Sequence, residues 1–298
     1  MKWIILSLSL LSACVPVDHS ITRAGSPVKP AADGATVAEQ LTTAYLDTRE
    51  NCDKPSTPAF LCSGVLFRGT KQSASHHAWN PKPGNTGVSF SYLRKDANFD
   101  HIAIGMVNGF IFYPYFNAPP GTLHPQILCA FPIDGYTWTR SGSGCGASSS
   151  YPDASDACQS QGINTAIQWS AHFAKGPAGV NLELIYAYVC GFNVQDSLND
   201  SAGPAFYQSL RAMHDLPPAL IHKYNELIIA AWPQDVPTSL PIQAFFYLPG
   251  GLSTAQLDQQ DFYTSSGGIV IPIIKMTLPA SVTGTAQFQY NEADQIHK

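Results

Sequence analysis

Apolar and polar residues follow two different periods along this chain, and each period predicts one kind of element. Apolar runs and alternation with period two predict strands. We expect them at Phe60–Phe67, Val88–Leu93, Phe110–Phe116, Ile127–Ile133, Asn225–Trp232, Ile242–Leu248 and Ile269–Met276. Helical spacing predicts Val37–Arg49, Asn164–Phe173 (with Asn164 as the N-cap), Ala205–Met213 and Thr254–Tyr263. Strands mixed with short helices and no internal repeat predict one α+β domain over residues 37–298, with mixed or antiparallel sheets.

The N-terminus has the layout of an export signal. Lys2 precedes an apolar run, Ile4–Leu11, and small residues then lead to Cys14. Leu11–Cys14 resembles the bacterial lipobox, which implies a signal peptide over residues 1–13 and lipidation of Cys14; the alternative is an ordinary signal cut elsewhere. Residues 14–36 are rich in Pro, Ala, Gly and Ser, as a flexible tether is. We expect an exported protein, either an outer-membrane lipoprotein or a secreted one, with lipid as its only membrane anchor.

Composition narrows the function classes. Of the seven cysteines, six remain after Cys14, and in an exported chain an even number predicts up to three disulfides of undetermined pairing. The cysteine and histidine spacings are not those of zinc sites, so we expect no metal. A net charge of −5 gives no basic surface for nucleic acid, so we expect no nucleic-acid partner. We also expect a monomer.

Arg68 is the first candidate for chemistry. It is predicted at the end of an apolar strand, where Gly69 and Thr70 resemble a turn. A guanidinium presents a planar fork that matches two phosphate oxygens, and Gly69 would let a ligand approach the backbone. The alternative is an ordinary surface turn.

Two further fragments follow in the chain. Ser89 and Ser91 are two residues apart, hence on one face of a strand. Glu226 opens a later strand. The order Arg68, Ser89-x-Ser91, Glu226 resembles the Arg–Ser–Glu class of mono-ADP-ribosyltransferase toxins. The resemblance implies that fold, with NAD as substrate, Glu226 as the catalytic residue, and Arg68, Gly69, Thr70, Ser89 and Ser91 around NAD.

A wider resemblance is to the halovibrin family of secreted bacterial proteins. It rests on strings at Arg49–Cys52, Phe60–Thr70, His77–Pro81, Val88–Ala97, Cys158–Ile163, Asn225–Leu227, Trp232–Asp235, Ala244–Pro249 and Asp261–Tyr263. Membership implies NAD-dependent ADP-ribosyltransferase or NAD glycohydrolase activity, with an acceptor protein not identified by the sequence. The toxins usually carry Glu or Gln two residues before the catalytic glutamate, on the acceptor side. This chain has Tyr224 there, which favours hydrolysis or an acceptor gripped by an aromatic ring.

Two other functions compete with this hypothesis. His76 and His77 lie in a Pro/Gly-containing loop and could serve as acid and base in a phosphodiesterase or nuclease. A non-enzymatic surface lipoprotein that binds a glycan or a host protein would also suit the low charge and high aromatic content. Asp100-His101 shows no third partner in the sequence, so we assign it to structure, and the aromatic run Phe110–Phe116 to core packing.

Overall fold

The computed structural model describes residues 33–71, 77–80, 87–103, 105–135, 145, 157–176, 188–194, 200–216, 224–230, 236–281 and 283–298. The predicted signal peptide, Cys14, most of the tether and His76 lie outside these ranges. Residues 31–298 form one compact unit.

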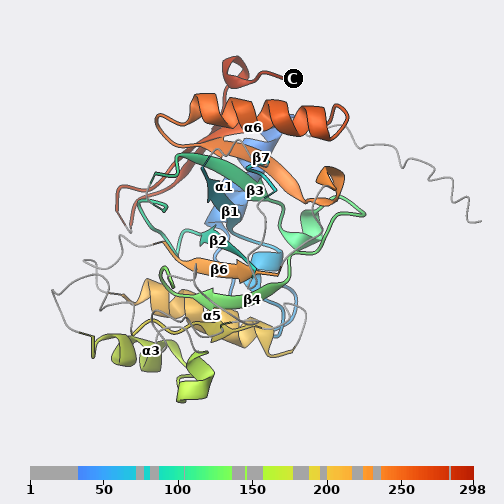
Figure 1. Ribbon diagram of the computed structural model, residues 1–298. Coiled ribbons are helices and arrows are strands. Elements are labelled where there is room, and N and C mark those ends of the chain that lie inside the picture. The colour runs from blue at the N-terminus through green and yellow to red at the C-terminus, as the bar shows by residue number, and fades with distance from the viewer. Residues whose placement is uncertain are drawn as a thin grey trace, which may run out of the picture. The chain divides into compact units, whose positions relative to one another are not determined.

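The unit is built on a nine-stranded sheet with the order β5-β4-β6-β2-β1-β3-β7-β8-β9 (Figure 1). Neighbouring strands are antiparallel except β7 and β8, which are parallel. The bounds are β1 Val65–Thr70, β2 Val88–Leu93, β3 Asn108–Phe112, β4 Ile127–Phe131, β5 Phe192–Asn193, β6 Glu226–Ile229, β7 Ile242–Tyr247, β8 Ile273–Thr277 and β9 Gln287–Tyr290.

Four α-helices lie in the described ranges, and α1, α5 and α6 pack against this sheet. Helix α6 lies along β7 and also contacts β3 and β8, while α5 contacts β4 and β5 at the other end and packs on α3 (Figure 1). Helix α1 contacts β1, β8 and β9. The bounds are α1 Gly34–Leu46, α3 Ala166–Phe173, α5 Ala202–His214 and α6 Leu252–Ser265, with 3-10 turns at Ala59–Leu61, Tyr115–Asn117, Cys158–Gln161, Pro237–Ser239 and Glu292–Asp294. Helices and a mixed sheet in one unit confirm the α+β class.

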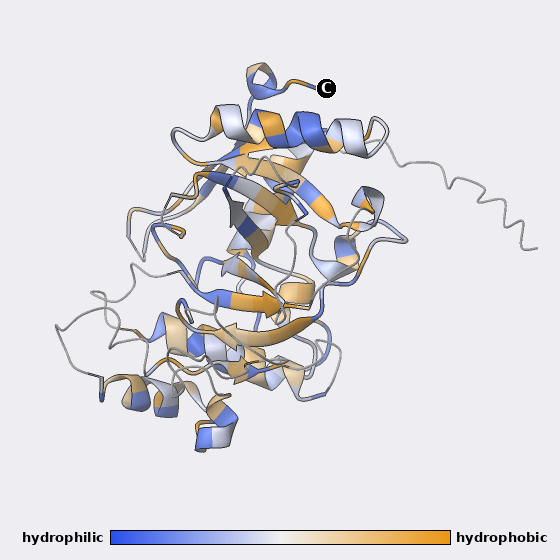
Figure 2. Cartoon of the chain, viewed as in Figure 1, coloured by the Kyte–Doolittle hydropathy of each residue, from blue (hydrophilic) through white to orange (hydrophobic). Residues whose placement is uncertain are grey.

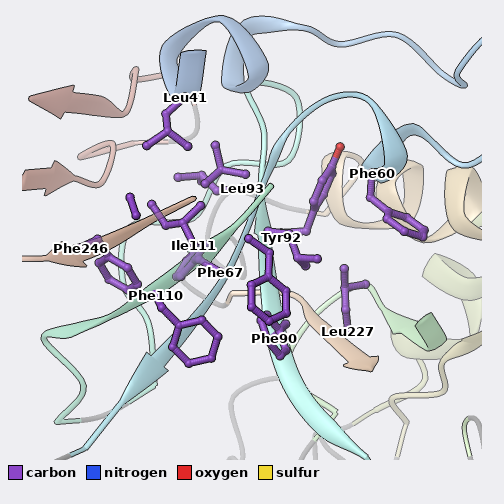
Figure 3. Close-up of a cluster of buried hydrophobic side chains, with 14 of the residues drawn as sticks. Leu41, Phe60, Phe67, Phe90, Tyr92, Leu93, Phe110, Ile111, Leu227 and Phe246 are labelled. Carbon is purple, nitrogen blue, oxygen red and sulfur yellow. The ribbon is translucent and has the colours of Figure 1, made fainter. Parts of the chain in front are cut away.

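Aromatic side chains fill the core around the central strands. Phe67 packs edge-on against Phe246, and Phe90 packs against Phe110 (Figure 3). Phe90 also packs against Phe112. Phe110 and Phe112 are fully buried, so the first part of the run Phe110–Phe116 packs the core, as expected. The prediction is wrong for its end, because β3 ends at Phe112 and Phe116 is 50% exposed. Figure 2 shows β4 and most of β6 in hydrophobic colours, whereas α6 carries both polar and apolar residues. The central strands are therefore held by apolar burial on both faces.

The predicted end of β1 is wrong. Residues 59–61 form a 3-10 turn, and β1 begins only at Val65. The strand includes Arg68, Gly69 and Thr70, where a turn was expected. All three residues pair with β3, with Gly69 opposite Gly109. A Cβ on Gly109 would lie 1.9 Å from the Arg68 carbonyl oxygen, so the two strands approach too closely there for any side chain. Gly69 and Gly109 therefore allow the close pairing of β1 and β3 and do not form a turn.

Helix boundaries also differ slightly from the expected ones. Helix α1 begins at Gly34 and ends at Leu46, so the helix takes up the last residues of the predicted tether. Helix α3 is capped by Thr165, not Asn164: the Thr165 side chain accepts from the Gln168 N–H, and the Gln168 side chain accepts from the Thr165 N–H. This reciprocal capping box satisfies two backbone donors at once.

Three disulfides join cysteines that are neighbours in sequence, Cys52–Cys62, Cys129–Cys145 and Cys158–Cys190. They use all six cysteines that follow Cys14 and indicate an oxidising, extracytoplasmic environment. Over the described ranges, the helices are too short or too polar to span a bilayer.

Candidate functional site

Arg68 lies in β1 with its guanidinium turned toward the start of β2. Arg68 Nη1 donates to the Ser89 carbonyl oxygen at 2.5 Å. Burial lowers the pKa of the Arg68 guanidinium to about 10, and the negative charge of Glu226 acts in the opposite direction. Within the described part of the chain, Arg68 Nε is buried and has no hydrogen-bond partner. A buried donor without an acceptor is rare, so this Nε is a candidate donor to a bound acceptor.

Ser89 connects this arginine to Glu226. Ser89 Oγ donates to Glu226 Oε1 at 2.5 Å, while the carbonyl of the same serine accepts from Arg68. Glu226 is the first residue of β6, as predicted, and only 4% of it is exposed. Ser89 pairs with Ile228, which is two residues after Glu226. The side chains of Ser89 and Glu226 therefore lie on one face of the β2–β6 pair. The structure thus brings together Arg68, Ser89 and Glu226.

The second oxygen of Glu226 is held by a residue that the sequence analysis missed. The Gly135 N–H donates to Glu226 Oε2 at 2.9 Å. Gly135 and Asp134 follow β4, whose last residue, Phe131, pairs with Glu226. An Asp-Gly dipeptide after a strand is a turn signal, but a backbone donor carries no side chain to reveal its role. Two donors fix the carboxylate in one orientation.

Tyr224 also contacts this segment. Its hydroxyl donates to Asp134 Oδ2 at 3.0 Å. Tyr224 lies two residues before Glu226, the first residue of β6. They bind neighbouring residues, Asp134 and Gly135. The predicted acceptor-side residue is therefore next to the predicted catalytic one.

The remaining candidates have different surroundings. Ser91 is buried opposite Phe67. A Cβ on Gly69 would lie 2.9 Å from Met106 Sδ and 3.1 Å from Ile102 Cδ1, so those side chains, not open space, cover Gly69. Thr70 is buried, and its hydroxyl accepts from Asn108 Nδ2.

Comparison with protein-family models, with curated proteins and with solved structures gave no match. The resemblance to halovibrins stays a prediction.

Thr70 belongs to a second polar cluster at α6. Asn108 Nδ2 also donates to Asp258 Oδ2 at 2.6 Å. Burial raises the pKa of Asp258 to about 7, the Asn108 hydrogen bond lowers it, and the charge of Asp261 adds to the rise. This cluster joins β1 and β3 to α6 through buried hydrogen bonds.

His77 is held at the same helix. His77 Nδ1 and Trp79 Nε1 both lie close to Asp261 Oδ2, at 2.6 and 2.7 Å, and the two rings stack at 4.7 Å. The contacts attach residues 77–80 to α6. His76, its predicted catalytic partner, lies outside the described residues. No group of three His, Cys, Asp or Glu side chains in the described ranges has the arrangement of metal ligands.

Proposed function

We propose that this protein cleaves the bond between nicotinamide and ribose in NAD, as a mono-ADP-ribosyltransferase or an NAD glycohydrolase. The observation that carries the proposal is the hydrogen-bonded series Arg68–Ser89–Glu226, in which one serine contacts both charged residues. The order of these residues resembles that in the Arg–Ser–Glu toxins, and the halovibrin-like strings are spread along the chain from Arg49 to Tyr263. The toxin fold is part of the proposal.

The roles follow from the charges that the reaction develops. When the C1′–N bond breaks, the electron pair stays on the nicotinamide nitrogen and positive charge builds on the ribose. Glu226 would stabilise that charge, because its carboxylate is fixed by Ser89 and Gly135 before substrate arrives. Arg68 would bind the pyrophosphate, which would supply the acceptor that its buried Nε lacks among the described residues.

The proposed location of the protein is outside the cytoplasm. We propose that Cys14 carries lipid and that the chain is an outer-membrane lipoprotein or is released as a secreted protein. The acceptor would be a protein outside the producing cell, or water. A nucleic-acid partner is not part of the proposal.

Release of nicotinamide from NAD by the purified mature protein tests the proposal, because transfer and hydrolysis share that product. Glu226→Gln offers one acceptor oxygen in place of two, so we expect kcat to fall by roughly 10²–10³-fold or more. Arg68→Lys should mainly raise KM, since an ammonium cannot reproduce the planar fork. Glu292→Gln is a matched control, because Glu292 is exposed and pairs only with Lys298 among the described residues.

Three results would separate the alternatives. Equal rates for Glu226→Gln and Glu292→Gln would refute the catalytic role of Glu226. No nicotinamide release by the unmodified protein would refute NAD cleavage and leave the glycan- or protein-binding hypothesis. Labelled ADP-ribose attached to a protein would identify the transferase, and free ADP-ribose the glycohydrolase.

A further inference from the structure

One side chain beside the proposed site has a partner that the sequence did not reveal. The His101 ring lies 6.2 Å from the Tyr224 ring, centroid to centroid, with an interplanar angle of 88°. The next residue, Ile102, covers Gly69, which directly follows Arg68. The segment that carries His101 therefore lies between the start of β6 and the end of β1.

The residues of this region form a series that runs from the interior to the surface. Glu226 is 4% exposed, Tyr224 is partly buried, and the His101 side chain is 49% exposed. Tyr224 precedes Glu226 by two residues and its ring contacts the imidazole of His101. The most exposed member of this series is therefore His101.

Asp100 orients the imidazole. His101 Nδ1 lies 2.7 Å from Asp100 Oδ1. A carboxylate on Nδ1 holds the proton of the neutral ring there and makes Nε2 the acceptor. Over the described residues, Nε2 makes no hydrogen bond. Among the described residues, the ionisable groups that contact His101 include Asp100, Tyr224 and, through the Tyr224 hydroxyl, Asp134.

We propose that His101 is the general base that takes the proton from the nucleophile, with Asp100 as its positioning residue. The inference rests on the proposed cleavage of NAD. The oxygen of water, or an acceptor atom, forms a bond to ribose C1′ as the C1′–N bond breaks. Nicotinamide leaves as a neutral molecule with the electron pair, and the proton lost by the nucleophile goes to His101 Nε2. Glu226 is less suited to this step, because Ser89 and Gly135 already donate to both of its oxygens.

The chain offers a close control. His214 also lies against the carboxylate of the next residue, with Nδ1 2.9 Å from Asp215 Oδ1, and its side chain is 53% exposed. It sits at the end of α5. His214→Ala therefore removes the same kind of exposed His–Asp pair without altering the proposed site.

The experiment measures nicotinamide release against pH for the unmodified protein, His101→Ala and His214→Ala. We expect His101→Ala to lower kcat about 10²-fold, to leave KM for NAD unchanged and to abolish the acidic limb of the pH profile. Added imidazole should restore part of the rate, which it would not do for a residue that only supports the fold. His214→Ala should match the unmodified protein.

The outcomes are distinct. An active His101→Ala with an unchanged pH profile overturns the role of His101 and leaves NAD cleavage standing. Loss of activity in His101→Ala that imidazole does not restore also overturns the general base. An unmodified protein that releases no nicotinamide overturns both proposals.

Discussion

Asp258 makes the stability of this protein depend on pH in a way that can be calculated. The carboxyl group is 4% exposed, on α6, and Asn108 Nδ2 donates to it at 2.6 Å. Burial raises its pKa from 3.8 to about 7. In the folded protein the group therefore keeps its proton at values of pH where the unfolded chain has lost it.

The sign and the size follow from proton linkage. Between the unfolded and the folded pKa of Asp258, the native state binds more protons than the unfolded chain. The stability that the protonated Asp258 contributes is therefore fully present below pH 3.8 and is lost as pH rises through about 7. At about pH 5 the protonated carboxyl contributes roughly 2 to 3 kcal/mol, and at about pH 8 almost nothing. Asp258→Asn keeps an acceptor for Asn108 but has no proton to lose.

Denaturant unfolding with the disulfides intact, at about pH 5 and about pH 8, measures this contribution. Between these two pH values the unmodified protein should lose roughly 2 to 3 kcal/mol more of its free energy of unfolding than Asp258→Asn does. Asp200→Asn is the control, since Asp200 is exposed. A difference that is the same at both pH values would refute the raised pKa and with it the burial argument.

Three further predictions concern the site and its export. Gly109→Ala places a Cβ 1.9 Å from the Arg68 carbonyl, so denaturation should show a loss of about 2–3 kcal/mol; an unchanged midpoint would contradict the close pairing of β1 and β3. Asn225→Ala leaves the backbone N–H and C=O of Tyr92 without their buried partner and should cost roughly 3 kcal/mol by the same assay, whereas a neutral effect would mean that water replaces the amide. Cys14→Ser should abolish incorporation of labelled fatty acid in the producing cell, and labelled Cys14→Ser protein would disprove the lipobox.

The elements that sequence predicts best here are those in which local pattern and tertiary packing agree. Strand β2 has the predicted bounds, because its alternation fits a strand paired on both sides. The end of β1 was missed because Gly69 resembles a turn residue, while the facing Gly109 lies on another strand. Strand β9, Gln287–Tyr290, was not predicted, since an edge strand with exposed glutamines has too few apolar residues to mark it.

The residues of the candidate site also differ in how far the sequence could indicate them. Arg68, Ser89 and Glu226 could be found from residue types in order, since each carries its chemistry in a side chain. The Gly135 N–H could not, because any residue except proline has one and only the fold aims it at Glu226. The contact of His101 with Tyr224 is equally a product of the fold. The hydrogen bond that the Thr70 hydroxyl accepts from Asn108 likewise joins two strands and could not be inferred from sequence alone.

The disulfide Cys129–Cys145 spans 16 residues, and the closed loop contains both Asp134 and Gly135. Thiols stay reduced in the bacterial cytosol, where the loop would have no covalent closure. The hydrogen bond that steadies one oxygen of Glu226 would then depend on oxidation after translocation. Under the proposed NAD cleavage, the site would thereby stay incompletely assembled while the chain is in contact with the NAD of the cell that makes it.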